Sequence, residues 1–120
     1  MKLTDEIYAE DFQLVVDHYL NRNRNILDTV SKYEISNARL SRAIAKAATQ
    51  CKCLSIQSEG ERENGIDGKL CKNCREIIEK EMGESLFYFA AICNALDISM
   101  FDTMLKEKKR LDVQIGRAHV

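Results

Sequence analysis

The chain contains no proline, and its first glycine is Gly60. Proline and glycine are the residues that most strongly disfavour helix, so nothing in the first fifty residues interrupts one. Side chains that suit one helix face recur there at spacings of three and four: Phe12, Val16, Tyr19, Asn23, Ile26, Val30, Tyr33, Asn37, Leu40, Ile44 and Ala47. We predict helices near residues 5–20 and 25–49. Residues 21–25 are weak helix formers that can hold a turn, and one long helix is equally allowed.

Strand signals are also lacking, and the second half of the chain shows the same helical period. The same spacing recurs from Ile78 to Leu96. Cys93 lies among apolar residues of this segment, which indicates that it is a small core residue. Ser99 followed by Asp102 is typical of a helix N-cap, which predicts a last helix over about residues 100–110. Residues 54–68 are polar and contain three glycines, and we expect a flexible excursion there. The predicted fold is all-α: an antiparallel bundle of three to four helices, with a cysteine-rich loop between the second and third.

Signals for export, for membranes and for nucleic acid are absent as well. The chain begins Met-Lys-Leu-Thr-Asp-Glu, without the cationic start and apolar run of a secretion signal, so we expect a cytoplasmic protein. No apolar run approaches the roughly 18 residues of a membrane helix. The net charge of −1 gives no argument for nucleic acid or for an anionic membrane as partner.

Four of the five cysteines form two closely spaced pairs, Cys51-Lys-Cys53 and Cys71-Lys-Asn-Cys74, with 17 residues between the pairs. The CxC and CxxC spacings each place two thiolates in one tight turn, and two such turns can converge on one tetrahedral ion. We therefore predict a metal-binding loop over residues 51–74, with zinc as the ion. A disulfide framework, a redox couple and inert buried thiols are the alternatives, and a reducing cytosol disfavours the disulfides.

No histidine lies near these cysteines, so thiolates fill all four predicted ligand positions. A catalytic zinc keeps an open position for water, whereas this ligand set is closed, and we predict a structural ion. Cys51 and Cys53 follow one predicted helix, and Cys71 and Cys74 precede or open the next, where the helix dipole favours thiolate. The metal would clamp the joint between the two helices. A site that loses zinc on oxidation is the alternative role.

The segment from Glu79 to Ile98 contains Glu-Lys-Glu-Met-Gly-Glu, then Leu-Phe-Tyr-Phe, then Leu-Asp-Ile. Over about residues 78–106 it resembles the third helix and following break of the MazG-like family, which are all-α nucleoside triphosphate pyrophosphohydrolases. In that family, carboxylates of an ExxE motif on one helix and an ExxD motif on the next hold Mg²⁺. The ion bridges the triphosphate and helps to activate water. The resemblance implies a MazG-like bundle, a nucleotide as ligand and assembly into a homo-oligomer, most simply a dimer.

Carried over onto this chain, the ExxD motif falls on Glu81 and Glu84, with Glu in place of Asp. The ExxE motif has no full counterpart, because the only acids of the second predicted helix are Asp28 and Glu34. The candidate catalytic residues are therefore Glu81, Glu84 and Glu34, and half of the expected magnesium site is missing. The simpler interpretation is that Glu81 and Glu84 are charged surface residues beside the apolar stripe of their helix.

A second resemblance covers nearly the whole chain. The runs over residues 23–28, 37–47 and 68–76, together with Cys-Lys-Cys and the MazG-like helix, are similar to a family of small proteins of clostridia and related Firmicutes. These are classed only as a domain of unknown function or as MazG-like. Cys-Lys-Cys stands where relatives often have Cys-Gly-Cys. The resemblance implies a bacterial cytosolic protein and brings no known activity with it.

The last six residues, Ile-Gly-Arg-Ala-His-Val, resemble the in-frame translation of a widely used sequencing adapter. We therefore expect a single domain over residues 1–114, with residues 115–120 not native and the natural chain continuing past Gln114. His119 is excluded as a ligand on this ground. The sequence as a whole predicts a zinc-stabilised, MazG-like protein that acts as a non-catalytic interaction or regulatory module. A magnesium-dependent pyrophosphohydrolase and a thiol/zinc redox sensor are the alternatives.

Overall fold

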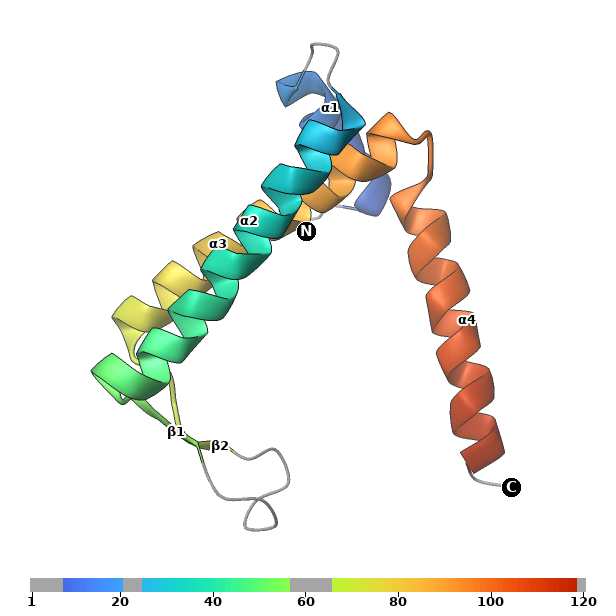
Figure 1. Ribbon diagram of the computed structural model, residues 1–120. Coiled ribbons are helices and arrows are strands. Elements are labelled where there is room, and N and C mark those ends of the chain that lie inside the picture. Colours follow the sequence, from blue (N-terminus) through green and yellow to red (C-terminus); the bar gives the residue numbers. More distant parts are fainter. Residues whose placement is uncertain (1–7, 21–24, 57–65, 119–120) are drawn as a thin grey trace, which may run out of the picture. The chain divides into compact units, whose positions relative to one another are not determined.

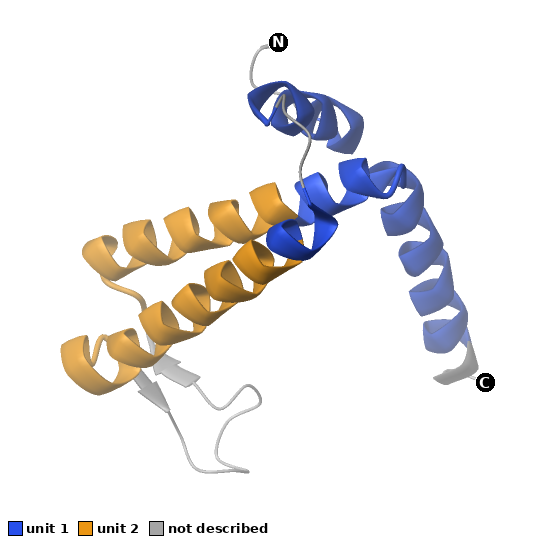
Figure 2. Ribbon diagram, turned by 45° about the horizontal axis from the view of Figure 1, so that its top comes forward, with its two compact units in different colours: residues 1–29, 89–120 blue, residues 30–88 orange. Residues whose placement is uncertain are grey.

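The computed structural model describes residues 8–20, 25–56 and 66–118. Its elements, in chain order, are α1 (Ala9–Tyr19), α2 (Ile26–Lys46), the π-helical turn η2 (Ala47–Cys51), β1 (Leu54–Ile56), β2 (Ile66–Gly68), α3 (Lys72–Ala95) and α4 (Met100–Ala118) (Figure 1). The elements form two compact units (Figure 2). We call residues 30–88 the cysteine unit, and residues 1–29 with 89–120 the terminal unit. Helices α2 and α3 contribute to both.

In the cysteine unit, α2 and α3 lie side by side and antiparallel (Figure 2). Small polar side chains join them at mid-length: the hydroxyls of Ser36 and Ser85 are 3.2 Å apart, and Ser85 donates to Asn37 Oδ1 at 2.8 Å. Ser36 is 1% exposed, and the other buried side chains described in this unit are those of Ala47 and Ile78. The unit therefore buries little apolar surface between its two helices.

The described ends of the connection between α2 and α3 form a strand pair that the sequence did not indicate. Strands β1 and β2 pair antiparallel, with Leu54 opposite Gly68 and Ile56 opposite Ile66. The expectation of no strands, and of a flexible excursion over all of residues 54–68, is wrong for the two ends of that segment. The middle of the loop, residues 57–65, lies outside the described residues. The pairing matters because β1 begins directly after Cys53, and β2 ends shortly before Cys71.

In the terminal unit, α3 ends where the sequence indicated a break. Asp97 adopts a left-handed backbone, with φ 56°. The amide of Ile98 donates to the Cys93 carbonyl at 2.9 Å, and that of Asp97 donates to the Asn94 carbonyl at 3.2 Å. This pair of bonds satisfies the last carbonyls of a helix in the Schellman arrangement. The chain can therefore turn from α3 into α4 without leaving these acceptors unpaired.

Helix α4 begins as predicted and ends later. The Asp102 amide donates to Ser99 Oγ at 3.0 Å, which confirms Ser99 as the N-cap. The prediction that the helix ends at about residue 110 is wrong, because α4 continues to Ala118. The Lys108 ammonium and the Asp112 carboxylate form an i,i+4 ion pair at 2.8 Å across the predicted end. The idea that residues 115–120 are not native stays a prediction.

Gln13 of α1 joins the end of α3 to the start of α4. Its amide nitrogen donates to Asn94 Oδ1 and to the Ile98 carbonyl, each at 3.0 Å. Its amide oxygen accepts from the Met100 amide at 2.6 Å, and Asn94 donates in return to the Gln13 carbonyl at 3.0 Å. The buried apolar side chains of this unit are those of Val16, Ala90, Ala91, Cys93 and Met100. Cys93, 4% exposed, is thus the core residue that the sequence predicted.

An all-α architecture with four helices is confirmed for the described residues, apart from the short β1–β2 pair. Two separate helices precede the cysteines, since α1 ends at Tyr19 and α2 begins at Ile26. Residues 5–7 and most of the expected turn, residues 21–24, lie outside the described residues. The MazG-like bundle and the single domain over residues 1–114 stay predictions. None of the described helices is both long enough and apolar enough to cross a membrane.

Candidate metal centre

The first cysteine pair lies at the end of a widened helical turn. Helix α2 continues into η2, whose last residue is Cys51. Lys52 then adopts a left-handed backbone with φ 67° and ψ 19°, which reverses the chain so that Cys53 follows at the start of the hairpin. The Cys53 sulfur lies 3.8 Å from the Ala47 carbonyl oxygen, at the opposite end of the π turn. The turn, the left-handed residue and the hairpin together place both sulfurs on one side.

The second pair opens α3. The Cys71 carbonyl accepts the first helical bond, from the Arg75 amide at 2.9 Å, so Cys71 occupies the N-cap position. Its side chain also acts as the cap, because the Cys74 amide donates to the Cys71 sulfur at 3.4 Å. Cys74 lies in the first turn of the same helix. The CxxC spacing is therefore the spacing between an N-cap and the residue whose amide it accepts.

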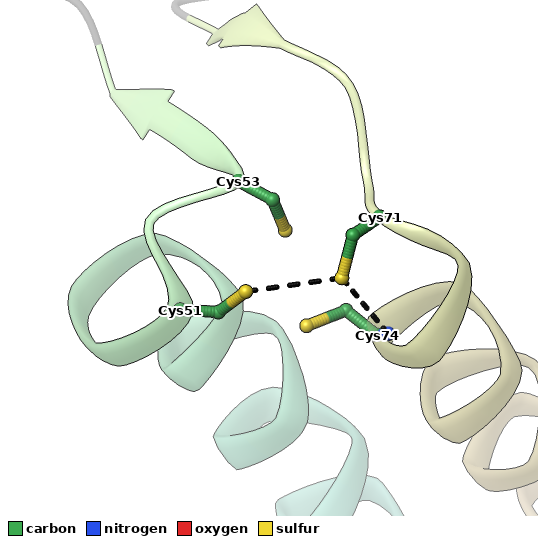
Figure 3. Close-up of side chains that lie close together, drawn as sticks. All are labelled: Cys51, Cys53, Cys71 and Cys74. Atoms are coloured by element: carbon green, nitrogen blue, oxygen red, sulfur yellow. Dashed lines mark hydrogen bonds between the residues drawn. The ribbon is translucent and has the colours of Figure 1, made fainter.

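All four sulfurs lie within 4.8 Å of one another and point toward a common centre (Figure 3). The Cys51 and Cys71 sulfurs are 3.8 Å apart. In a tetrahedral zinc site with Zn–S of about 2.3 Å, neighbouring sulfurs are about 3.8 Å apart. All five cysteines are free thiols, so no disulfide competes for these sulfurs. The four side chains could hold one metal ion with only small movements.

The thiols of Cys51, Cys71 and Cys74 change one another's pKa values. The amide of Cys74, and after it the Cys74 thiol, lowers the pKa of Cys71 from 9.0 to about 7. In return, the contact with Cys71 raises the pKa of Cys74 to about 12, and the same contact raises the pKa of Cys51. In the metal-free chain, the Cys71 thiolate therefore accepts hydrogen bonds from the protonated thiols of Cys51 and Cys74. A divalent cation must displace those protons when it binds, so metal affinity increases with pH.

The candidate carboxylates do not form a comparable cluster. Among the described residues, the only group of three or more Cys, His, Asp or Glu whose ligand atoms converge is the four cysteines. Glu34 is exposed on α2, and Glu84 pairs with Arg39 at 3.8 Å and with Lys80 at 3.7 Å. Glu81 is half-buried on α3, and its Oε1 atom is buried without a hydrogen-bond partner among the described residues. The structure thus places the three carboxylates in three different environments.

A set of polar residues that the sequence did not single out lines an open cavity of about 790 Å³ in the terminal unit. Its lining includes Gln13 and Asn94, and five carboxylates without any lysine or arginine: Glu10, Asp11, Asp17, Asp97 and Asp102. The carboxylates come from three separate segments, so no local sequence pattern indicates that they line the same cavity. This cavity repels anions and does not suit a free triphosphate.

Comparison with protein-family models, with curated proteins and with solved structures gives no match for this chain. The functional argument therefore rests on the site. Its four sulfurs are the one group of side chains in the described part of the chain whose arrangement suits an ion.

Proposed function

We propose that the chain is a zinc-stabilised, MazG-like helical protein of the bacterial cytosol, which acts as a non-catalytic interaction or regulatory module. The observation that carries this proposal is the convergence of four cysteine sulfurs within 4.8 Å at the joint between α2 and α3. The resemblance of residues 78–106 to the third helix of MazG-like proteins supports the scaffold.

Zinc is the ion that this ligand set favours. Four thiolates in tetrahedral arrangement select zinc or iron among the common metals, and zinc needs no redox partner to stay bound. With four protein ligands, the ion has no open position for water or substrate. The role of the metal is therefore to hold η2 and the start of α3 together. In isolated finger peptides, structural zinc contributes about 10–16 kcal/mol at neutral pH.

The metal content of the protein tests the proposal directly. Protein purified without chelator should contain one zinc per chain by elemental analysis, and Cys53→Ser and Cys74→Ser should each abolish that content. Cys93→Ala is the matched control, because Cys93 lies in the terminal unit, outside the cluster, and should leave the zinc in place. A metal-free protein, or iron in place of zinc, would contradict the assignment.

Removal of the metal should change the fold locally. Because the cysteine unit buries few apolar side chains, a chelator should lower the helix signal in circular dichroism and increase amide exchange in η2 and in the first turn of α3. Amides around Ser99, in the terminal unit, should change less. Equal amide exchange rates in η2 and α3 with and without zinc would show that the ion is not a structural element.

A magnesium-dependent nucleotide pyrophosphohydrolase is the second candidate. The observation that favours it is the buried, unpartnered Oε1 atom of Glu81, since an unsatisfied buried carboxylate oxygen is costly and a cation would satisfy it. Protein incubated with Mg²⁺ and a panel of nucleoside triphosphates should then release pyrophosphate, and Glu81→Ala should abolish the release. Glu79→Ala is the control, because Glu79 is exposed on the same helix. No release from any nucleotide would eliminate this candidate.

We also propose that the chain forms a homodimer. The cysteine unit exposes apolar side chains at Ile44 (41%), Met82 (46%) and Leu86 (50%). Sedimentation should give twice the chain mass, and Leu86→Glu should shift the protein toward monomer. A monomer at micromolar concentration would contradict the proposal.

A further inference from the structure

The four cysteines of the site differ in how well they are shielded. Cys51 is exposed, whereas Cys53, Cys71 and Cys74 are half-buried. The Cys71 sulfur also accepts a hydrogen bond from the Cys74 amide. Hydrogen bonds to a coordinated sulfur withdraw electron density and so lower its nucleophilicity. Cys51 is therefore the ligand that a small electrophile in solution can reach most easily.

The Cys71 sulfur lies 3.8 Å from that of Cys51 and comes from the facing end of α3. A disulfide has a sulfur–sulfur distance of about 2.05 Å, so the two atoms must approach by about 2 Å. Exposed Cys51 is the last residue of η2, directly before the left-handed residue Lys52, and a rotation about its χ1 angle supplies such a movement. The structure thus pairs the most accessible thiolate with a close resolving thiolate on the facing helix.

We propose that Cys51 is an oxidation site for hydrogen peroxide, and that its oxidation releases the metal by forming a Cys51–Cys71 disulfide. This inference rests on the proposed zinc site. The Cys51 thiolate attacks one peroxide oxygen, the O–O bond breaks, and hydroxide leaves and takes up a proton to become water. The product is a sulfenic acid, in which the sulfur has lost two electrons.

The Cys71 thiolate then attacks the sulfenic sulfur. The S–S bond forms, the S–O bond breaks, and the hydroxide that leaves becomes a second water. In total, two thiolates lose two electrons, one peroxide gains them, and two protons are taken from solvent. Only Cys53 and Cys74 remain as thiolate ligands, and two thiolates do not retain zinc against competing chelators. The disulfide still links η2 to α3, so the site changes from a metal clamp to a covalent one.

The experiment measures both the released zinc and the disulfide in the zinc-loaded protein. One equivalent of hydrogen peroxide should release zinc to a chromogenic chelator, and a reductant should restore binding. Trypsin separates all four cysteines onto different peptides because it cleaves after Lys46, Lys52, Arg62, Lys69, Lys72 and Arg75. Without reduction, mass spectrometry should find the peptide of residues 47–52 linked to that of residues 70–72.

Ligand-retaining variants separate oxidation from metal loss. Cys51→His keeps four zinc ligands and removes the exposed thiol, so peroxide-driven release should slow at least tenfold. Cys93→Ala is the control, because Cys93 is buried in the terminal unit and outside the cluster, and it should release zinc at the parental rate. Protein that carries no zinc as purified would remove the proposed function itself. Zinc-loaded protein that resists peroxide, or that forms a Cys71–Cys74 disulfide instead, would overturn this inference alone.

Discussion

Among the described residues of the metal loop, Lys52 is the one non-glycine residue with a left-handed backbone. Its φ of 67° and ψ of 19° lie in the left-handed region, which costs a residue with a Cβ atom roughly 1–2 kcal/mol. Glycine adopts this region without that cost, but it loses about 0.5–1 kcal/mol more entropy when it is ordered. Lys52→Gly should therefore stabilise the turn by about 0.5–1 kcal/mol. Because metal binding and ordering of this turn are coupled, zinc affinity should rise about two- to fivefold.

Two control variants separate backbone strain from charge. Lys52→Ala removes the same ammonium and keeps the Cβ atom, so zinc affinity should stay near that of the parent. Lys46 ends α2 in ordinary right-handed geometry, with φ −66° and ψ −34°. Lys46→Gly should therefore lower stability, by about 1 kcal/mol.

The assay is competition for zinc against a chromophoric chelator, with thermal unfolding of the zinc-loaded proteins as a second measurement. If removal of positive charge near the thiolates decided zinc affinity, the affinity of all three variants would change in the same direction. Equal zinc affinities for Lys52→Gly and Lys52→Ala would refute the argument from strain.

Three further predictions concern the remaining residues of the fold and the site. Gln13→Ala removes three side-chain hydrogen bonds, to Asn94, Ile98 and Met100. It should lower the free energy of unfolding by about 2–4 kcal/mol in urea titrations. A loss below about 0.5 kcal/mol would show that these hydrogen bonds do not hold α1 to the α3–α4 junction. Thiol titration of zinc-loaded protein should find Cys51 as the first cysteine to react, a chelator should free the other three cluster thiols, and denaturant should then free Cys93. Burial raises the pKa of the Cys93 thiol above its usual 9.0, so the unfolded chain loses this proton at lower pH than the folded chain. Stability should fall as pH rises above 9, and Cys93→Ala should reduce the difference measured between about pH 8 and about pH 10.

The cysteine pairs were predictable because the spacing within each pair is local: CxC and CxxC each fix two sulfurs within one turn. The N-cap of α4 was predictable for the same reason, since Ser99 and Asp102 lie within one turn. The helices were predictable for the same reason, since a period of 3.6 is visible within ten residues. Their ends were less so: α4 continues past Arg110 through an i,i+4 ion pair that a search for caps does not detect.

The features that sequence reasoning missed depend on contacts between distant residues. Gln13 and Asn94 are 81 positions apart, and neither has a local pattern that marks it as half of a reciprocal amide pair. Strands β1 and β2 have three residues each, too few to show alternation, and they are defined only by their pairing. The MazG-like pattern indicated Glu81 and Glu84 as one pair. In the structure, Glu84 turns to Arg39 and Lys80, while one Glu81 oxygen is buried.

The contrast between the ends and the middle of the cysteine unit explains why a metal belongs where the cysteines lie. At mid-length, α2 and α3 meet through Ser36 and Ser85, and hydrogen bonds of this kind contribute only about 0.5–1.5 kcal/mol each. Ile78 is the one large apolar side chain described as buried in the unit, and full burial of such a side chain contributes about 1.5–3 kcal/mol. A four-thiolate zinc exceeds both by several-fold. If the proposed zinc is bound, the helix pair depends more on its cysteine end than on its core, and loss of the ion by oxidation would alter the part of the fold least able to compensate.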